Sequence, residues 1–424
     1  MRIDIEQLLK ENSAVNDYRI NRTVTESYEL FFVHRTLETV RATDTESVNV
    51  TVYVDHDGKK GNASFRIYAS TEEEEARAKI ADAVKKAALV GNEYYEIPAN
   101  ETLEGKIASN FEEYTPRALA AKIADAVFSA DTLENGSINA LEVFVNKLTV
   151  SVKNSRGIDK TEVKYSAMLE AIPTWNEGES VELYEAKRFS SLDMDDIREE
   201  ISRRMREVRD RGKATPPTEK LSCPVLLQTQ ELAELIASLA GDLGYGSVYA
   251  HANPFSEGDA LQKNATGDGI TLTMRGALEG CVASALFDDD GTTLVDTEII
   301  KDGLVTSYYG SSRFAQYLGK PVTGALSCMD VSLGSLSEEE LKKAPYFACA
   351  SMSGLQVDVY NDYIGGEVRL AYYFDGEKTI PMTGVSISGK LSDALASIRL
   401  ANVASTTGRY RGPAFALFGG IEIV

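Results

Sequence analysis

The amino-acid sequence predicts an α+β protein, in which an N-terminal α/β domain with an antiparallel sheet and amphipathic helices precedes a β-rich C-terminal domain. Strand-like alternation of apolar and polar residues over 27–68 and two later amphipathic helix patterns indicate the first domain. The end of the chain, rich in Gly, Thr, Ser, Tyr and Val with closely spaced turn signals, indicates the second. The 424 residues are enough for two or three domains, and a 43% apolar fraction supplies their cores.

The first strands are expected over 27–33, 37–40, 48–54 and 63–68, as an antiparallel meander with a turn at Asp57 and Gly58. Helices are expected over 71–91 and 116–130. They share the segment AKIADAV, and the absence of a third copy argues against a solenoid. Further strands are expected over 140–145, 148–152, 162–165 and 181–184, followed by a charged helix from Asp193 to about Arg211.

Residues 212–217 read Gly-Lys-Ala-Thr-Pro-Pro and are predicted to end that helix and form a linker. We therefore expect an N-terminal domain over 1–212, with subdomains over 1–97 and 115–212, a linker over 213–220 and a C-terminal domain over 221–424. In the C-terminal domain, residues 223–227 predict a strand and 230–242 predict a helix with an apolar stripe.

The charge balance excludes some classes of function. There are 44 Lys and Arg against 65 Asp and Glu, a net charge of −21, which argues against a surface that follows nucleic acid. The one dense basic run, at residues 203–211, alternates with carboxylates and is interpreted as a solvated helix face. No apolar run reaches the roughly 20 residues of a membrane helix.

The histidines and cysteines restrict the metal chemistry. His34, His56 and His251 are too far apart in sequence to form a zinc helix. The four cysteines, at 223, 281, 328 and 349, form no CxxC pair. Because the charged start Met1-Arg2-Ile3-Asp4 shows no secretory signal, reduced thiols and a cytoplasmic location are expected.

Other chemical motifs are weak. A cysteine nucleophile needs a nearby base, and His251 is the one histidine in the C-terminal half; buried, inert cysteines are the alternative. Residues 287–291, Phe-Asp-Asp-Asp-Gly, lack the ligand spacing of a calcium loop, so a hairpin turn and a strand over 294–300 are expected. The glycines at 241–246 and the Ser-Gly-Lys at 388–390 do not fit nucleotide-binding loops.

Several segments of the C-terminal half together resemble the TldD/PmbA family, which is named for modulators of DNA gyrase. Residues 286–291 resemble its FDDEG segment, and residues 300–319 with 323–324 resemble the IEDGVLQSYLLSSYSARKLG stretch. Residues 387–395 resemble its ISGNLLDML turn and helix, and 412–420 resemble its terminal segment. The matches follow the family's order over about 140 residues, and the expected N-terminal α/β domain agrees with the family's architecture.

The resemblance implies a subunit type. TldD-type members resemble metallopeptidases whose HExxxH helix and a later cysteine hold zinc, whereas PmbA (TldE)-type members lack the motif and pair with them. Laid on this chain, the motif puts Glu231 at the position of the general base, while Gln230 and Leu235 replace both histidines. Leucine offers no zinc ligand and glutamine a poor one.

We therefore expect a cytoplasmic, metal-free subunit without a cofactor of its own, inactive alone. Zinc would reside in a TldD-like HExxxH partner, and an extended peptide would be the substrate, docked as an added strand. Two alternatives stay open: a homodimer that binds a peptide or small ligand without chemistry, and a metal-independent hydrolase using Cys281, Cys328 or Glu231. No direct contact with nucleic acid or membrane is expected.

Overall fold

The N-terminal half forms one large curved sheet. The computed structural model describes residues 3–178 and 180–424, so Met1 and Arg2 of the charged start lie outside the described residues. The strand order is β4-β3-β2-β1-β6-β7-β5, with β8 and β9 also paired to β7. The bounds are β1 Asp17–Val33, β2 Thr36–His56, β3 Lys59–Ile67, β4 Asn92–Glu93, β5 Thr102–Lys106, β6 Gly136–Asn154, β7 Asp159–Trp175, β8 Val181–Glu182 and β9 Glu185–Phe189.

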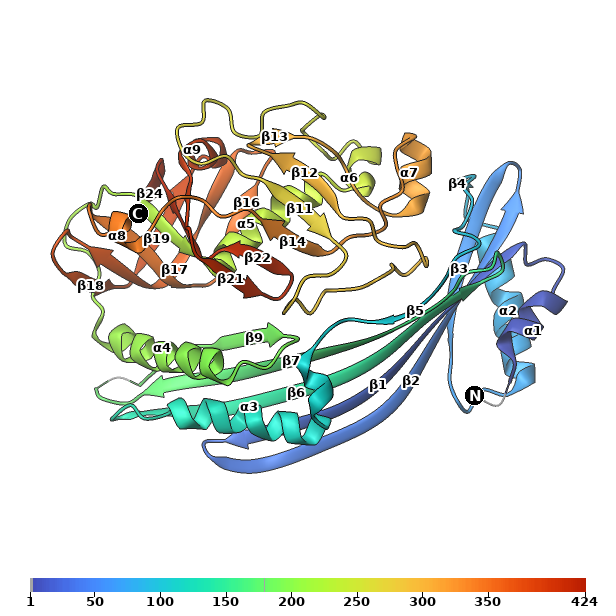
Figure 1. Ribbon diagram of the computed structural model, residues 1–424, viewed down its shortest axis with the longest axis horizontal. Coiled ribbons are helices and arrows are strands. Elements are labelled where there is room, and N and C mark those ends of the chain that lie inside the picture. Colours follow the sequence, from blue (N-terminus) through green and yellow to red (C-terminus); the bar gives the residue numbers. More distant parts are fainter. Residues whose placement is uncertain (1–2, 179) are drawn as a thin grey trace.

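Two separate groups of helices pack at opposite ends of the long strands (Figure 1). Helices α1 (Ile5–Glu11) and α2 (Glu73–Ala87) cover one apolar cluster with β1, β2 and β3. Helices α3 (Pro116–Ala130) and α4 (Met194–Lys213) cover another with β1, β6 and β7, after a short 3-10 turn at Asn110–Glu113. Both helices that share the AKIADAV segment therefore bury an apolar face on the sheet, as expected.

The first strands are longer than predicted. Residues 37–40 and 48–54 were expected to be two strands, but Thr36–His56 is continuous and pairs with β1 along its length. The intervening segment carries charged residues but no Gly or Pro, so nothing in its backbone interrupts the ladder. Pairing with a neighbouring strand outweighs the low strand preference of the charged residues.

The C-terminal half contains two further sheets with a shared core. One has the order β20-β23-β10-β15-β17-β19-β24, with β16 and β18 on β17; the other is β13-β12-β11-β14-β22-β21. The strands are β10 Val225–Gln228, β11 Leu272–Arg275, β12 Thr297–Lys301, β13 Leu304–Val305, β14 Cys328–Val331, β15 Tyr346–Met352, β16 Gln356–Asp358, β17 Tyr363–Phe374, β18 Thr379–Met382, β19 Val385–Gly389, β20 Arg399–Leu400, β21 Ala404–Thr407, β22 Tyr410–Pro413, β23 Phe415–Phe418 and β24 Ile421–Ile423. The helices are α5 Thr229–Asp242, α6 Tyr245–Tyr249, α7 Ser312–Leu318, α8 Glu338–Leu341 and α9 Leu391–Ser397.

The predicted α+β class is confirmed, with small shifts of element ends. Helix α4 continues through Gly212 and Lys213, which were predicted to lie beyond it, and ends just before Pro216 and Pro217. The strand expected over 294–300 begins only at Thr297. The division into domains at 213–220 stays a prediction. In the described chain no helix is long and apolar enough to cross a membrane.

The loop over residues 286–293 fastens the C-terminal half to the N-terminal sheet. Phe287 packs with Val152 and Ile158, and Asp290 forms an ion pair with Arg19. The carboxylate of Asp288 accepts the backbone N–H groups of 290, 292 and 325, at 2.9–3.0 Å, and so holds the turn. The expected hairpin turn is therefore present, and it joins the C-terminal half to strands β1 and β6.

Candidate functional site

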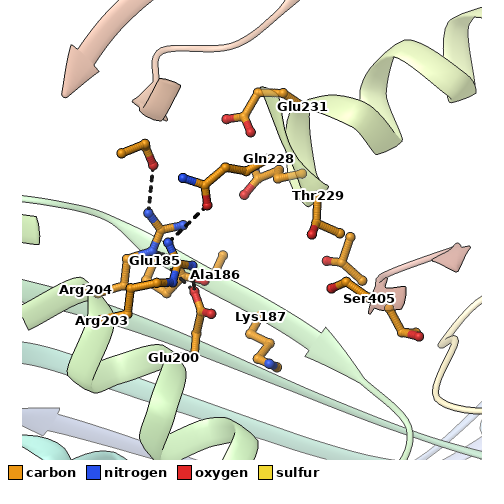
Figure 2. Close-up of a pocket in the computed structure, with 14 residues that line it drawn as sticks. Glu185, Ala186, Lys187, Glu200, Arg203, Arg204, Gln228, Thr229, Glu231 and Ser405 are labelled. Carbon is orange, nitrogen blue, oxygen red and sulfur yellow. Dashed lines mark hydrogen bonds and ion pairs between the residues drawn. The ribbon is translucent and has the colours of Figure 1, made fainter. Parts of the chain in front are cut away.

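A small cavity lies where α4 and β9 meet the start of α5 and strand β21 (Figure 2). Its volume is about 90 Å³, well below the roughly 300 Å³ of a typical small-molecule site, so it admits waters or one side chain rather than an organic cofactor. The lining residues are Glu185, Ala186, Lys187, Glu200, Arg203, Arg204, Gln228, Thr229, Gln230, Glu231, Ala350, Ser405, Thr406 and Thr407.

A network of ion pairs forms one wall of this cavity. Arg204 contacts Glu185 across to β9, with 2.5 Å between Nε and Oε2, and Glu207 one turn along α4, at 2.8 Å. Arg203 pairs with Glu200 and, at 2.7 Å, with Glu207. Because these groups are largely withdrawn from water, each depends on its partners much more than a surface ion pair does.

The same two arginines also join the halves of the chain. Arg204 donates a hydrogen bond of 3.1 Å to the carbonyl of Ala350 in β15, and Arg203 donates one of 3.3 Å to Gln228 just before α5. The prediction of a solvated helix face is therefore wrong for this part of the basic run. Glu207 is only 4% exposed, and the side chain of Arg204 is 12% exposed.

Burial and charge shift the acidities in this network. Burial raises the pKa of Glu185 despite the neighbouring Arg204. Burial alone would also raise the pKa of Glu200, but Arg203 and Arg204 together lower it below its usual value. The pKa of Arg204 lies above its ordinary value because the attraction of Glu185, Glu207 and Glu200 exceeds the effect of burial. The carboxylates of this network are thus stabilised mainly by the positive charges of Arg203 and Arg204.

The predicted base position lies in the wall of this cavity. Glu231 is in the first turn of α5, and burial raises the pKa of its carboxyl to about 7. Gln230 is exposed at the rim, whereas Leu235 is fully buried in the C-terminal core. One side chain thus lies at the rim and the other in the core, so the structure does not bring Gln230 and Leu235 together. The placement of the HExxxH motif stays a prediction.

The cavity does not fit zinc. Its lining contains neither His nor Cys, and Arg203 and Arg204 place two positive charges beside the carboxylates. Zinc requires three or four N, S or O ligands that are free to bind it, whereas Glu185 and Glu200 are already engaged by guanidinium groups. Throughout the described residues, no three His, Cys, Asp or Glu side chains form a metal-binding group.

The cysteines and His251 do not form a nucleophile and base pair in this structure. Cys281 and Cys328 are fully buried and share a hydrogen bond, which together with burial keeps the pKa of Cys281 high. His251 is exposed on a turn after α6. Cys349 is buried near Glu231, and burial holds its pKa well above the usual value, whereas partly buried Cys223 has a pKa raised to about 11. Elevated pKa values make Cys223, Cys281 and Cys349 poor nucleophiles. Contact with Cys281 instead lowers the pKa of Cys328, but that side chain is fully buried.

Sequence reasoning singled out Glu231 but missed Glu185, Arg204 and the β21 segment that share its cavity. One signal was available for Arg204. It lies three residues after Ile201 and four before Val208, both on the buried stripe of α4, so helical spacing places it beside the apolar face. Nothing comparable pointed to residues 405–407, because only the folded chain brings them next to α5.

Comparison with known proteins identifies the family. The sequence model of the PmbA/TldA metallopeptidase C-terminal domain matches residues 220–423. Metalloprotease PmbA of Escherichia coli O157:H7 is 27% identical over 179 residues, which are 41% of this chain and 39% of that protein. This chain is a member of the TldD/PmbA family. The match thus covers about two fifths of the curated relative, and the chain is related to metallopeptidases.

Solved structures share the fold over the full length of the chain. TldE from Thermococcus kodakarensis superposes with a TM-score of 0.83 at 15% identity and covers 99% of both chains. A proposed modulator of DNA gyrase from Thermotoga maritima gives 0.78 at 17% identity, covering 99% of this chain and 98% of the other. Another from Bacteroides thetaiotaomicron gives 0.78 at 12%, covering 99% and 97%. At these identities the likeness establishes the fold alone.

Proposed function

We propose that this TldD/PmbA member is a metal-free, TldE-like subunit of a two-chain peptidase that processes unfolded peptides or peptide precursors. A separate HExxxH-bearing homologue supplies the zinc chemistry. The observation that supports the proposal is the cavity beside Glu231, whose lining has no His or Cys and whose carboxylates Glu185 and Glu200 are paired with two arginines instead of being free to bind zinc. The shared fold with TldE agrees with this assignment.

Two open strand edges at this cavity support the docking of an extended peptide. Strand β9 pairs only with β7 and β21 only with β22, within the described residues, and residues 185–187 and 405–407 line the cavity from either side. The strands meet at one end, where the N–H of Gly408 donates to the carbonyl of Arg188 at 3.4 Å. A peptide added to either edge would gain backbone hydrogen bonds with little demand on its sequence.

The first test separates this subunit from an enzyme complete in itself. The purified chain is assayed for bound metal by mass spectrometry and for cleavage of an unfolded, fluorogenic peptide, alone and mixed with an HExxxH-bearing homologue. We expect no stoichiometric zinc and no cleavage alone, and chelator-sensitive cleavage after mixing. Chelator-sensitive cleavage by the chain alone would overturn the proposal. A homodimer that stays inactive with every such homologue would favour the non-catalytic alternative.

The second test addresses the docking edge in the active mixture. Thr407 and Tyr410 close a two-residue turn, so the N–H of Thr406 points away from β22 and toward the cavity side. Thr406→Pro removes this donor, and we expect KM for an extended peptide to rise about tenfold, the equivalent of one lost backbone hydrogen bond. Thr406→Val keeps the N–H and the side-chain shape and should leave KM unchanged. Equal effects of both variants would contradict docking at β21.

A further inference from the structure

The outer half of β2 is an open edge of the N-terminal sheet. Strand β3 pairs with β2 only from Val48 onward and lies beside the other end of β2 in Figure 1. Residues 36–45 are all exposed. Among the residues that the structure describes, the part of β2 before Val48 pairs on one side only, with β1. An edge of this length normally carries a bulge, a Pro or a Lys that prevents association, and here the one bulge lies at its far end, near Glu38.

The backbone groups that this edge presents can be assigned from the register. His56 and Lys59 close a two-residue turn and pair without irregularity back to Val48 and Ile67, so the even-numbered residues of β2 direct their N–H and C=O groups toward β3. The same alternation continues through the open segment. Val40, Ala42, Asp44 and Glu46 therefore present free donors and acceptors, while the odd-numbered residues bond to β1.

Two of the four side chains of this row, those of Asp44 and Glu46, are acidic, and the row contains no basic residue. Asp44 lies directly opposite Glu26 of β1, and Glu26 is already neutralised by Lys147 of β6, with 2.7 Å between Nζ and Oε1. Glu46 is paired with Arg22 at 2.6 Å. Across the sheet the order of charges is thus Lys147, Glu26, Asp44, and within the described residues Asp44 forms no ion pair. Like charges directly opposite destabilise a ladder, and a basic residue on the next strand would relieve this.

We propose that the open edge of β2, residues 40–46, docks an extended strand of a different protein chain that places a Lys or Arg opposite Asp44. A second copy of this chain fits poorly. In an antiparallel pair of two β2 edges, the even-numbered residues of both copies lie on one face of the sheet. The second copy would therefore add carboxylates to that face rather than a cation. Arg41, the one basic residue of the segment, belongs to the odd-numbered row and is held over Phe31 beside Glu29. The inference does not depend on the proposed peptidase function.

The test uses a charge-reversed form of the same chain as the basic strand. Asp44→Lys places a cation next to Glu26, which favours rather than disturbs the existing ladder. Hydrogen exchange over residues 36–47 is measured for the original chain, for the variant and for their equimolar mixture. We expect the outward amides to exchange without protection in either chain alone and about tenfold more slowly in the mixture.

A blocking variant shows whether protection arises at this edge. Ala42→Pro removes one outward N–H without using a hydrogen bond to β1, and it should abolish the protection in the mixture. Protection of the outward amides of residues 40–46 in the original chain alone would overturn the proposal in favour of self-association. An unprotected mixture, or protection that survives Ala42→Pro, would overturn it as well. Unchanged fluorescence of Trp175 confirms that each variant is folded.

Discussion

Replacing Arg204 tests whether the ion network at the cavity stabilises the fold. Arg204→Ala removes the contacts to Glu185 at 2.5 Å, to Glu207 at 2.8 Å and to the carbonyl of Ala350 at 3.1 Å. The buried carboxylate of Glu185 then loses its paired cation, and that of Glu207 keeps only Arg203, at 2.7 Å. Removal of one partner from a buried pair costs about 3–5 kcal/mol, a large share of the 5–15 kcal/mol by which a typical protein is stable.

Urea unfolding at pH 7, followed by the fluorescence of Trp175, measures this loss. Trp175 is the single tryptophan and packs against Val208 of α4, so it reports the part of the molecule that carries Arg204. Arg206 is exposed on the same helix, and Arg206→Ala is the matched control, with an expected change within about 0.5 kcal/mol. Arg204→Met keeps the apolar stem and should lose nearly as much stability as the alanine variant, because the missing charge dominates.

The pH dependence gives this prediction a second readout. Burial already raises the pKa of Glu185, so in the variant this carboxyl takes up a proton at a higher pH than an ordinary carboxyl does. A neutral carboxyl no longer needs the guanidinium, and the difference between the original chain and Arg204→Ala should shrink between pH 7 and pH 5. Equal unfolding free energies for Arg204→Ala and Arg206→Ala at pH 7 would refute the reasoning.

Three further changes test other parts of the structure. The pKa of Glu231 is raised to about 7, so its neutral form favours the fold below pH 4.5 and this contribution is lost as the pH rises to 7. In urea unfolding, Glu231→Gln should therefore stabilise the chain by up to about 3 kcal/mol at pH 8 and change its stability little at pH 4.5. Leu235→His combined with Gln230→His should cost about 3 kcal/mol or more, from a buried polar group in the core, and give no stoichiometric zinc by mass spectrometry; zinc binding would contradict the geometry. Gly291→Ala should cost about 1–3 kcal/mol more than Gly408→Ala in thermal unfolding, because both have positive φ but only the first Cβ would lie 2.7 Å from Ile158.

Local patterns were sufficient to predict most elements but not their lengths or contacts. Helix α3 has the predicted ends, because Thr115 caps it and Pro116 occupies the first turn. Strand β2 was divided in two because its exposed residues show no apolar alternation, and only its pairing with β1 makes it continuous. Such pairing joins residues far apart in sequence, and no local window contains it.

The cavity, too, is formed by residues that are distant from one another in the sequence. Glu231 could be singled out from a family motif, but its neighbours Glu185 and Ser405 come from strands of two different sheets. The sequence interpretation treated the charges of α4 as solvated because their spacing alone gives ion pairs within the helix. That interpretation failed where the helix meets a second layer, since burial converts the same charges into contacts between the two halves.

The segment that first indicated the family has a structural explanation that is separate from zinc chemistry. In residues 286–293 the carboxylate of Asp288 fixes the turn, Gly291 lies where a side chain would strike Ile158, and Phe287 fills the contact with the N-terminal sheet. Each of these roles sets how the two halves meet. The cavity at α4, β9 and α5 is lined by residues of both halves and so depends on how they meet. The motif therefore identifies the architecture of the family rather than the chemistry that a given member performs.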